Sequence, residues 1–205
     1  MFYEIAKNDH GLPHDPLKAI VAPRPIGWIS SLDEKGVANL APYSFFNLVA
    51  APPPVVMFSS GTVKDSQNNI EKTGEFVCNL ATAALADAVN DSSAHVAADV
   101  DEFDVANIAK APSRLVKPPR VAASPAHLEC VYLQTVVLPH DPKTEIQWSM
   151  VLGKVVAVHI ADEFIKDGLV DTSAFNPLTR LGYLDYGLLG EVFTKPRPDR
   201  NDLAS

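Results

Sequence analysis

The sequence predicts a mainly β fold in which strands form a barrel and short helices are inserted between them. Six segments are rich in β-branched and aromatic residues, whereas the helical segments between them are short. Strands and helices do not alternate regularly, as they would in a doubly wound parallel sheet. A dinucleotide-binding Rossmann sheet is also disfavoured, because no two glycines are separated by a single residue and the GxGxxG pattern is absent.

Length and composition are typical of one folded domain. The chain has 205 residues, of which 47% are hydrophobic and 20% are charged, unlike the composition of disordered chains. We expect a single domain over residues 1–205, with extensions at residues 1–18 and 193–205. With 17 Lys and Arg against 25 Asp and Glu, the net charge is −8, and we therefore expect no nucleic-acid partner.

The N-terminal region and the apolar segments favour a cytoplasmic protein that has no membrane partner. Residues 1–14 lack the basic start and the apolar stretch of a signal peptide. The longest apolar run, residues 48–58, is interrupted by prolines and is shorter than the roughly 18–20 residues that a membrane helix needs. Cys78 and Cys130 lie in apolar stretches without CxxC spacing, which favours buried reduced thiols over a disulfide or a zinc site.

The first predicted element is a β-hairpin. Residues 26–32 and 37–46 are rich in strand-forming residues, and residues 33–36 form a turn in which Gly36 can adopt a positive φ. Pro42 has no N–H to donate to a neighbouring strand. The second strand is therefore expected at a sheet edge or at a bulge.

A third strand and a short helix follow the hairpin. The strand covers residues 55–60, directly after prolines that cannot continue a ladder. Residues 64–74 predict a helix that is capped by Asp65 or Ser66 and ended by Gly74.

The rest of the chain predicts three more strands and one more helix. Residues 76–80 form the fourth strand, and the alanine-rich residues 82–90 form a helix with a threonine cap. The two longest strands cover residues 128–138 and 148–160, which are nearly continuous in aliphatic and aromatic residues. The proline-rich loop over residues 111–125 is expected to wrap a surface.

Polar side chains gather where predicted strands end and the first helix begins. They are Ser30, Ser31, Ser59, Ser60, Gly61, Thr62, Lys64, Asp65, Ser66 and Asn69. A strand end that breaks into small hydroxyl residues and then starts a helix offers N–H groups, hydroxyls and a cation to a bound phosphate group. The alternative is that these residues only form turns and caps, and the spacing alone does not decide between the two.

A second cluster covers residues 39–47, with the sequence NLAPYSFFN. Because neighbouring side chains of a strand point to opposite faces, the small Ala41 and Ser44 leave room for a flat ring. Tyr43, Phe45 or Phe46 can pack beside this ring. An ordinary aromatic core explains the same residues.

Familiar catalytic and metal-binding signatures are absent from the sequence, including GxxxxGK[ST], HExxH and GxSxG. His10 and His14 are four residues apart, but Pro13 between them prevents the helical spacing that would put both on one face. We expect no metal site. His127 and His159, on or beside the long late strands, are expected to be packed strand residues.

Five blocks in order carry a resemblance to a known family. The blocks are residues 24–31 (RPIGWISS), 39–47 (NLAPYSFFN), 64–66 (KDS) with Asn69, 74–79 (GEFVCN), and 180–182 (RLG) with Tyr183 and Tyr186. Over nearly the whole chain, residues 20–192, the sequence resembles the flavin reductase-like family, which includes the flavoredoxin-like proteins. The resemblance implies an FMN-binding split β-barrel that forms a homodimer, with FMN held noncovalently near the subunit interface and NADH or NADPH as co-substrate.

The resemblance also implies which residues hold the coenzyme. The KDS block and nearby hydroxyls would hold the phosphate, the strand that carries Trp28 would lie along the ribityl chain, and the APYS block would line the isoalloxazine ring. The late RLG block would form the far wall, across the dimer. The implied cofactor-binding set is Trp28, Ser30, Ser31, Ala41, Pro42, Tyr43, Ser44, Asn47, Ser59, Ser60, Lys64, Asp65, Ser66, Asn69, Arg180 and Gly182, with no catalytic side chain and no metal. Lys64 and Ser66 are expected to be exposed until a phosphate arrives.

This chain departs from the family pattern at one position. Many relatives read RLGG where this chain has Arg180, Leu181, Gly182 and Tyr183. A bulky ring therefore stands where a glycine often allows close approach. The departure affects the shape of a nicotinamide pocket more than it affects the binding of FMN.

The leading hypothesis is an NAD(P)H-dependent flavin reductase, in which bound FMN accepts hydride and passes electrons to free flavin, a metal complex or another acceptor. Because the cofactor carries this chemistry, the absence of a catalytic triad or a carboxylate pair does not argue against an oxidoreductase. Trp148 can stack on nicotinamide or pack as an ordinary strand residue. The alternatives are an FMN-binding electron carrier or flavin-storage protein, and a split barrel that has lost flavin.

Overall fold

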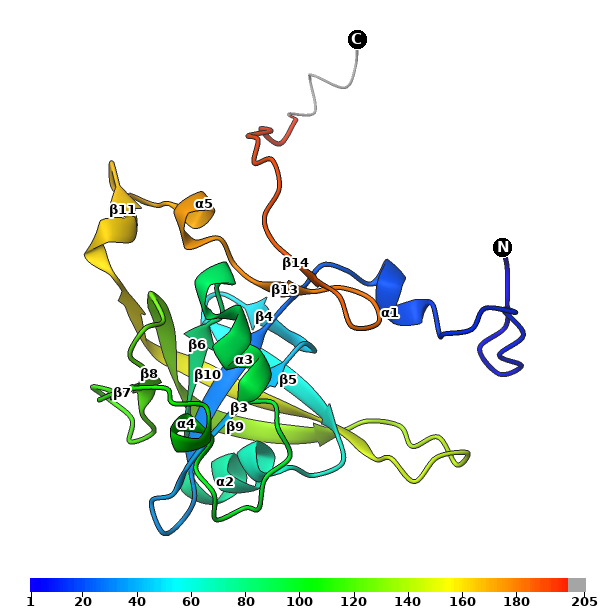
Figure 1. Cartoon of the computed structure of the whole chain (residues 1–205), viewed down its shortest axis with the longest axis horizontal. Helices are drawn as coiled ribbons and strands as arrows, with labels where there is room; N and C mark the ends of the chain where they lie inside the picture. Colours follow the sequence, from blue (N-terminus) through cyan, green and yellow to red (C-terminus); the bar gives the residue numbers. More distant parts are fainter. Residues whose placement is uncertain (199–205) are drawn as a thin grey trace.

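A seven-stranded antiparallel sheet is the main element of the computed structural model, which describes residues 1–198. The strands follow the order β3-β2-β6-β9-β10-β5-β4 and curl around a common interior (Figure 1). Their bounds are β2 (Gly27–Leu32), β3 (Ala38–Tyr43), β4 (Phe46–Ala50), β5 (Val55–Gly61), β6 (Glu75–Leu80), β9 (Ala126–Val137) and β10 (Trp148–Ile160). The mainly β fold with short helices, which the sequence predicts, is confirmed.

Strands β2 and β3 form the predicted hairpin. In the turn, the Asp33 carboxylate accepts hydrogen bonds from the N–H groups of Lys35 (2.8 Å) and Val37 (2.7 Å). Gly36 adopts a φ of +88°, as predicted, which a residue with a side chain rarely adopts.

The strand predicted over residues 37–46 is wrong in its last part. β3 ends at Tyr43, and β4 begins at Phe46 and pairs with β5 at the other end of the sheet. At the corner between them, the Phe45 carbonyl accepts the N–H of Ser59 at 2.8 Å. The chain therefore crosses from one end of the sheet to the other here. Pro42 lies in the terminal strand β3, in agreement with the predicted edge position.

Both faces of β2 are buried, because each packs against a separate core. Ile29 points into the barrel interior, together with Phe58 and Phe76. Its neighbour Trp28 points the other way, into a second core that includes Phe103. The alternation of a strand explains why β2 is buried along nearly its whole length.

Helix α2 (Asp65–Thr73) packs against β2, β3 and β9 and ends at Gly74, as predicted. Gly74 has a φ of +78°, and its N–H donates to the Ile70 carbonyl at 2.8 Å. The predicted cap is wrong: Lys64 is the N-cap residue, while Asp65 and Ser66 lie in the first turn. The hydroxyl of Ser66 does not cap the helix, because it donates to a side chain of β3 instead.

The second predicted helix is two elements. A 3₁₀ turn, η1 (Ala83–Leu85), precedes α3 (Ala86–Asp91), and Thr82 takes the N-cap position without a side-chain hydrogen bond. With α4 (Glu102–Val105), these elements cover the second core on the outer face of β2 and β3 (Figure 1).

The two long predicted strands are β9 and β10, which pair along most of their length. Gly153 of β10 faces the ring of the buried Phe76, and a Cβ at this position would lie 2.2 Å from Phe76 Cζ. Only a glycine allows this close approach. Cys78 and Cys130 are buried and free, in agreement with the sequence prediction.

The proline-rich loop contains a small ladder of β7 (Lys110–Ala111), at its start, and β8 (Arg120–Val121). Between them the loop lies over the barrel, where backbone N–H groups of Arg114, Leu115 and Val116 donate to the carboxylate of Glu129 in β9. The prediction that the loop wraps a surface is confirmed.

The remaining elements are short and lie toward the two ends of the chain. They are α1 (Leu17–Ile20), β1 (Arg24–Pro25), η2 (Asp162–Phe164), β11 (Ile165–Lys166), β12 (Leu169–Val170), α5 (Thr172–Phe175), β13 (Thr179–Arg180) and β14 (Tyr186–Gly187). β1, β13 and β14 form a small sheet that joins the two end regions. The N-terminal segment and the chain after β14 project away from the barrel (Figure 1).

The predicted C-terminal extension, residues 193–205, lies in part outside the described residues. Within residues 1–198, no helix combines the length and the apolar character that crossing a membrane requires.

Candidate functional site

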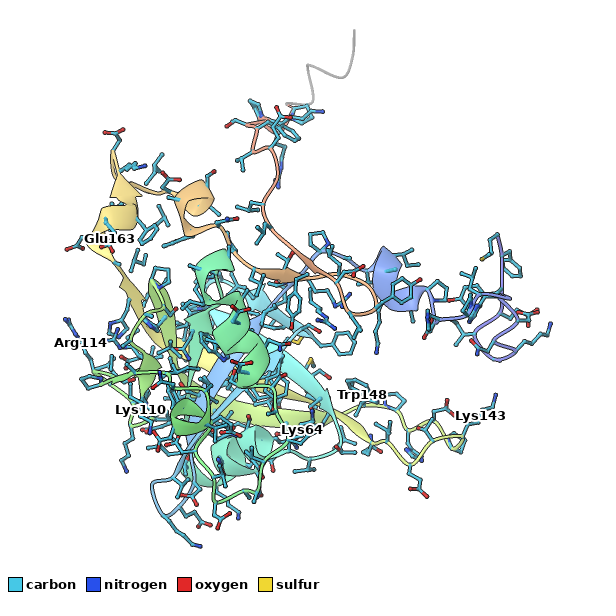
Figure 2. The ribbon with its side chains drawn as sticks, viewed as in Figure 1. Lys64, Lys110, Arg114, Lys143, Trp148 and Glu163 are labelled. Carbon is cyan, nitrogen blue, oxygen red and sulfur yellow. The ribbon has the colours of Figure 1, made fainter. Side chains whose placement is uncertain are left out.

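Two cavities adjoin at Lys64 and share Pro42 and Tyr43. We call the first the helix-side cavity; its volume is about 390 Å³, and it is lined by β3, by the start of α2 and by the loop after α3. We call the second the arginine-side cavity; its volume is about 250 Å³, and it lies between the β3–β4 corner, the end of β5 and the small end sheet. In Figure 2, Lys64 lies near α2, and Trp148 lies farther right, at the start of β10.

The segment between β5 and α2 leaves the N-terminus of the helix open. Thr62 adopts a φ of +66°, which is rare for a residue with a β-branched side chain. Lys64 follows in an extended conformation, and no side chain caps the first turn of α2. The N–H groups at the start of a helix carry partial positive charge and bind anions. The helix start and the Lys64 ammonium group therefore place positive charge between the two cavities, and we call this arrangement the cradle.

A buried polar network holds the start of α2, which forms part of this cradle, against β3 and α4. Asn39 Oδ1 accepts the hydroxyl of Ser66 at 2.6 Å, and Asn39 Nδ2 donates to the Glu102 carboxylate at 2.8 Å. The second oxygen of Glu102 accepts the N–H of Leu40 at 3.0 Å. This network connects α2, β3 and α4, so the start of α2 is held in place on the sheet.

Burial raises the pKa of two groups that line the helix-side cavity, Glu102 and Tyr43. Burial raises the pKa of Glu102, against hydrogen bonds from the Leu40 N–H and from Asn39 that lower it. Burial also raises the pKa of Tyr43 to about 12, from a value of 10 at which the phenol is already protonated at neutral pH. Tyr43 therefore presents a neutral ring, which packs on Phe58 with ring centroids 4.6 Å apart.

The arginine-side cavity is lined by four cationic side chains and by no carboxylate. The four are Lys18, Arg24, Lys64 and Arg180. None of them forms an ion pair with a carboxylate within residues 1–198. In a chain with net charge −8, an uncompensated cationic pocket is a specific feature that suits an anionic ligand.

Arg24 organises the wall of this cavity. Its Nη1 donates to the carbonyls of Lys18 and Val21, both at 2.6 Å, and its Nη2 donates to the carbonyl of Leu181 at 2.7 Å. The residue is only 8% exposed, and its Nε is buried and has no hydrogen-bond partner among the described residues. A buried donor without a partner is uncommon in a folded protein.

The structure brings many of the predicted site residues together at these cavities. Those that line one or both are Ala41, Pro42, Tyr43, Ser44, Ser59, Ser60, Lys64, Asp65, Ser66 and Arg180. Ser66, expected to be exposed, is fully buried, because its hydroxyl donates into the network below the cradle. Lys64 is exposed, as expected.

Four other predicted residues form the support under the cavities and do not line them. Trp28 is buried, and its Nε1 donates to Ser92 Oγ at 2.9 Å. Ser30 donates to the Pro119 carbonyl. Ser31 and Asn69 hydrogen-bond to each other, also in the interior. Any contribution of these residues to ligand binding stays a prediction.

Two predicted residues have other surroundings. Asn47 is exposed on β4, and its side chain accepts the N–H of Leu48. Gly182 faces α1, where a Cβ would lie 2.6 Å from the Cβ of Ala19. The structure thus explains Gly182 by the packing of α1, and a role for either residue in ligand binding stays a prediction.

Sequence reasoning missed several residues that line the cavities. Lys18 and the segment from Ser92 to Val96 come from loops without a recognisable pattern. Glu102 is distant in sequence from the strand and helix residues that it joins, and no sequence pattern indicated that this acidic side chain is buried. Arg24 stands in the RPIGWISS block, so that block contained the signal for it.

Residues 21–179 match the family described as "Flavin reductase like domain". This chain belongs to the flavin reductase-like family. An uncharacterised protein of Halalkalibacterium halodurans is 35% identical over 183 residues, which cover 87% of each chain. The family membership gives this flavin reductase-like protein a flavin-related oxidoreductase role.

Solved structures agree with this family assignment. Nitrilotriacetate monooxygenase component B from Bacillus cereus aligns with a TM-score of 0.87 and 27% identity, over 95% of this chain and 98% of that one. A structure from Shewanella frigidimarina NCIMB 400 that is described as having a split barrel domain aligns with a TM-score of 0.78 and 18% identity, over 96% and 94% of the two chains. The fold of the flavin reductase-like chain is therefore a split barrel, as the resemblance implied.

The residues of the two cavities fit a flavin mononucleotide. A phosphate suits the open N-terminus of α2 and the Lys64 ammonium group. A flat heterocycle with polar edges suits the adjoining wall of Pro42, Tyr43 and Ser44, because the Arg24 and Arg180 side chains line the same cavity. The donor set thus matches a ligand with an anionic end and a polar aromatic end.

Proposed function

We propose that this protein binds FMN noncovalently across the two cavities, takes hydride from NADH or NADPH and passes electrons to free flavin, a metal complex or another acceptor. The observation that carries the proposal is the junction of the two cavities at Lys64, beside the uncapped start of α2. A phosphate-bearing ligand that enters at this point reaches both cavities. The family role in flavin-related redox chemistry supports the same ligand.

The phosphate would be held by this chain's own donors at the β5–α2 junction. Lys64 supplies a charge, and the first turn of α2 supplies N–H groups. Ser59 and Ser60 line the arginine-side cavity directly before the junction. Asp65, in the first turn, carries a negative charge next to the cradle, so the Lys64 charge is needed to keep the local potential favourable for an anion.

The wall from Ala41 to Ser44 would hold the ring. Tyr43 is buried against Phe58, which fixes the position of this wall. Phe45 and Trp148 close one side of the arginine-side cavity, with ring centroids 5.3 Å apart. Arg24 and Arg180 place positive charge next to this wall, which stabilises negative charge on a bound ligand.

When bound, FMN supplies the two-electron redox chemistry, and the protein supplies position and electrostatics. Trp148 and Tyr183 both line the arginine-side cavity and would flank the nicotinamide. The cations of this cavity match the phosphates of NADH or NADPH.

We also propose a homodimer in the cytoplasm. β4 is the terminal strand of the sheet, and its Leu48 and Val49 side chains are 54% and 50% exposed. An exposed apolar edge strand next to the β3–β4 corner suits contact with a second copy of this chain. Light scattering coupled to size exclusion tests this part, with Leu48→Lys as the variant expected to give monomers.

An anaerobic absorption titration tests the redox proposal. The purified protein, saturated with FMN and freed of unbound flavin, is mixed with NADH or NADPH in separate experiments. Bleaching of the flavin band with either nucleotide supports the reductase. A retained flavin band that neither nucleotide bleaches would instead indicate an electron carrier or a flavin-storage protein. Failure to retain FMN at all would reject the flavin site.

A further inference from the structure

A third cavity, of about 430 Å³, lies apart from the two coenzyme cavities, where β9 begins and β10 ends. Its lining includes Arg114, Arg120, Ser124, His127, Val158 and His159. Figure 2 shows Arg114 at the left edge of the molecule, across the barrel from Trp148. We call this cavity the β9–β10 cavity.

Two nitrogens of the Arg120 guanidinium are held by neighbouring residues, and the third keeps its N–H groups available for a ligand. Its Nε donates to the Pro112 carbonyl at 3.1 Å, and its Nη1 lies 3.4 Å from His127 Nδ1. His127 Nε2 lies 2.9 Å from the Val121 carbonyl and must donate to it. In the neutral ring, Nδ1 therefore accepts from Arg120, and the Nη2 group has no partner among the described residues.

The buried Glu129 under this cavity does not neutralise the arginines. One of its oxygens accepts the Arg114 N–H at 2.8 Å and faces His159 Nε2. The other oxygen accepts the N–H groups of Leu115 (2.6 Å) and Val116 (3.1 Å). Four donors satisfy this carboxylate, so it fixes the loop that carries Arg114 and the ring of His159. Glu129 therefore does not neutralise the guanidinium charges of Arg114 and Arg120.

Two arginines thus line one cavity without an ion-pair partner anywhere in residues 1–198. Each guanidinium has N–H groups left to donate, and the two are carried by backbone that a buried carboxylate and the β7–β8 ladder hold in place. In a protein with 25 acidic residues, two arginines without an ion-pair partner in one cavity suit an anionic ligand.

We propose that the β9–β10 cavity binds the phosphate group of a small molecule. A phosphate dianion presents several oxygens in different directions, which suits two guanidinium groups, one on the β7–β8 loop and one on β8, whereas a carboxylate is satisfied by one of them. The proposal does not depend on the coenzyme cavities, because it uses none of their residues. The phosphate group can belong to inorganic phosphate or to an organic phosphomonoester.

Calorimetric titration of the full chain tests this proposal, with inorganic phosphate and with glycerol 3-phosphate as the two ligands. The titrations are performed on FMN-saturated protein, so that the cradle at Lys64 is filled, and repeated on flavin-free protein. The variants are Arg114→Gln and Arg120→Gln, and the control is Lys154→Gln, which removes an exposed charge elsewhere on β10.

We expect dissociation constants below about 1 mM that rise at least about tenfold in each arginine variant and stay unchanged in the control. Similar affinities for both ligands would show that the phosphate group alone is recognised, and tighter binding of the ester would show that the cavity also binds the organic part. Either result supports the proposal. Absence of binding up to about 10 mM overturns it. So does binding that both arginine variants retain, or tighter binding of acetate than of phosphate.

Thermal unfolding of each variant provides the folding control. An arginine variant that unfolds at the wild-type temperature and no longer binds phosphate supports a binding site. Arginine variants that change the molar mass in light scattering but bind phosphate normally would assign the two arginines to a subunit interface, and would overturn the proposal.

Discussion

The guanidinium of Arg24 donates to the carbonyl of Leu181 at 2.7 Å, which connects residues that are 157 positions apart in the chain. The same guanidinium holds the carbonyls of Lys18 and Val21. One side chain therefore joins α1, the first strand and the RLG segment into the wall of the arginine-side cavity.

Arg24→Lys is expected to loosen this wall, because a lysine ammonium cannot reach three carbonyls in the fixed geometry of a guanidinium. Loss of hydrogen bonds from a buried charged group costs about 1.5–3 kcal/mol each, so the free energy of unfolding should fall by a few kcal/mol. Urea unfolding measures this change, and FMN titration of the folded variant should show weaker binding. Arg197→Lys is the matched control, at an exposed arginine near the end of the described chain. Unchanged stability in Arg24→Lys would contradict the assigned role.

Lys64→Ala is expected to weaken FMN binding without destabilising the fold. Lys64 is exposed and forms no ion pair within the described residues, so it contributes little to stability. A charge-assisted bond to phosphate is worth about 1.5–3 kcal/mol, which corresponds to a dissociation constant about ten to a hundred times higher. Fluorescence titration with FMN measures this effect. Lys72→Ala, at the other end of α2, should bind FMN normally. Equal FMN affinities in the Lys64→Ala and Lys72→Ala variants would show that Lys64 does not bind the phosphate.

Tyr183 adopts a φ of +56°, in the left-handed region that favours glycine. Its ring is 49% exposed, lines the arginine-side cavity and contacts His14, with centroids 5.7 Å apart. Both Tyr183→Gly and Tyr183→Ala remove the ring, but only the glycine relieves the backbone strain. The glycine variant should therefore be more stable than the alanine variant by about 1 kcal/mol.

Chemical denaturation of the two Tyr183 variants measures this difference directly. Both variants should also widen the arginine-side cavity and lower the KM for the nicotinamide donor, if the reductase proposal holds. A Tyr183→Ala variant as stable as Tyr183→Gly would show that the positive φ carries no strain.

Two neighbouring titratable groups predict a two-step loss of stability in acid. Burial lowers the pKa of His127 to about 4, from 6.5. The unfolded chain therefore takes up this proton first, and the stability that the neutral ring provides is complete above pH 6.5 and is lost as the pH falls through about 4. Burial opposes ionisation of Glu129, but hydrogen bonds from the Arg114 N–H and from His159 outweigh it and lower its pKa to about 2, from 4.5. The contribution of Glu129 is therefore present above pH 4.5 and is lost as the pH falls toward 2.

The free energy of unfolding, measured against pH, separates the two steps. His127→Gln should flatten the profile above pH 4, whereas Glu129→Gln should flatten it below pH 4.5 and lower stability at neutral pH. Identical profiles for the wild-type protein and both variants would refute these assignments.

Much of the fold follows from local patterns in the sequence. The β2–β3 hairpin, the end of α2 at Gly74 and the long strands β9 and β10 depend on strand propensity, on a turn and on a glycine with positive φ, all of which are local. The start of α2 was less predictable. Asp65 and Ser66 are both good caps, and the choice of Lys64 depends on Ser66 finding a partner, Asn39, on a strand 27 residues earlier.

The strand β4 shows where local patterns fail. Residues 37–46 read as one strand, because the aromatic residues at the corner have high strand propensity. The chain nevertheless bends after Tyr43, since Phe46 can pair with β5 only at the opposite end of the curled sheet. Propensity does not contain this information, because the pairing depends on where β5 lies in the folded barrel.

The candidate site divides in the same way. The KDS and APYS blocks identified residues that line the two cavities, because each block is contiguous in the chain. Glu102, Lys18 and the loop after α3 join them only through folding, and Trp28 and Ser30 prove to be buried support. Hydrogen bonding to a distant partner decides whether a polar side chain supports a cavity or lines it.

By itself, the sequence determined the mainly β class, most of the strands, the reduced cysteines and the family, since these depend on periodicity, composition and contiguous motifs. Only the tertiary structure decided that Arg24 holds Leu181, that Glu129 anchors the proline-rich loop and that one cavity is lined by two arginines that have no ion-pair partner in residues 1–198. These relationships join residues far apart in the chain, and their energies depend on burial and on hydrogen-bond geometry, which exist only after the barrel has formed.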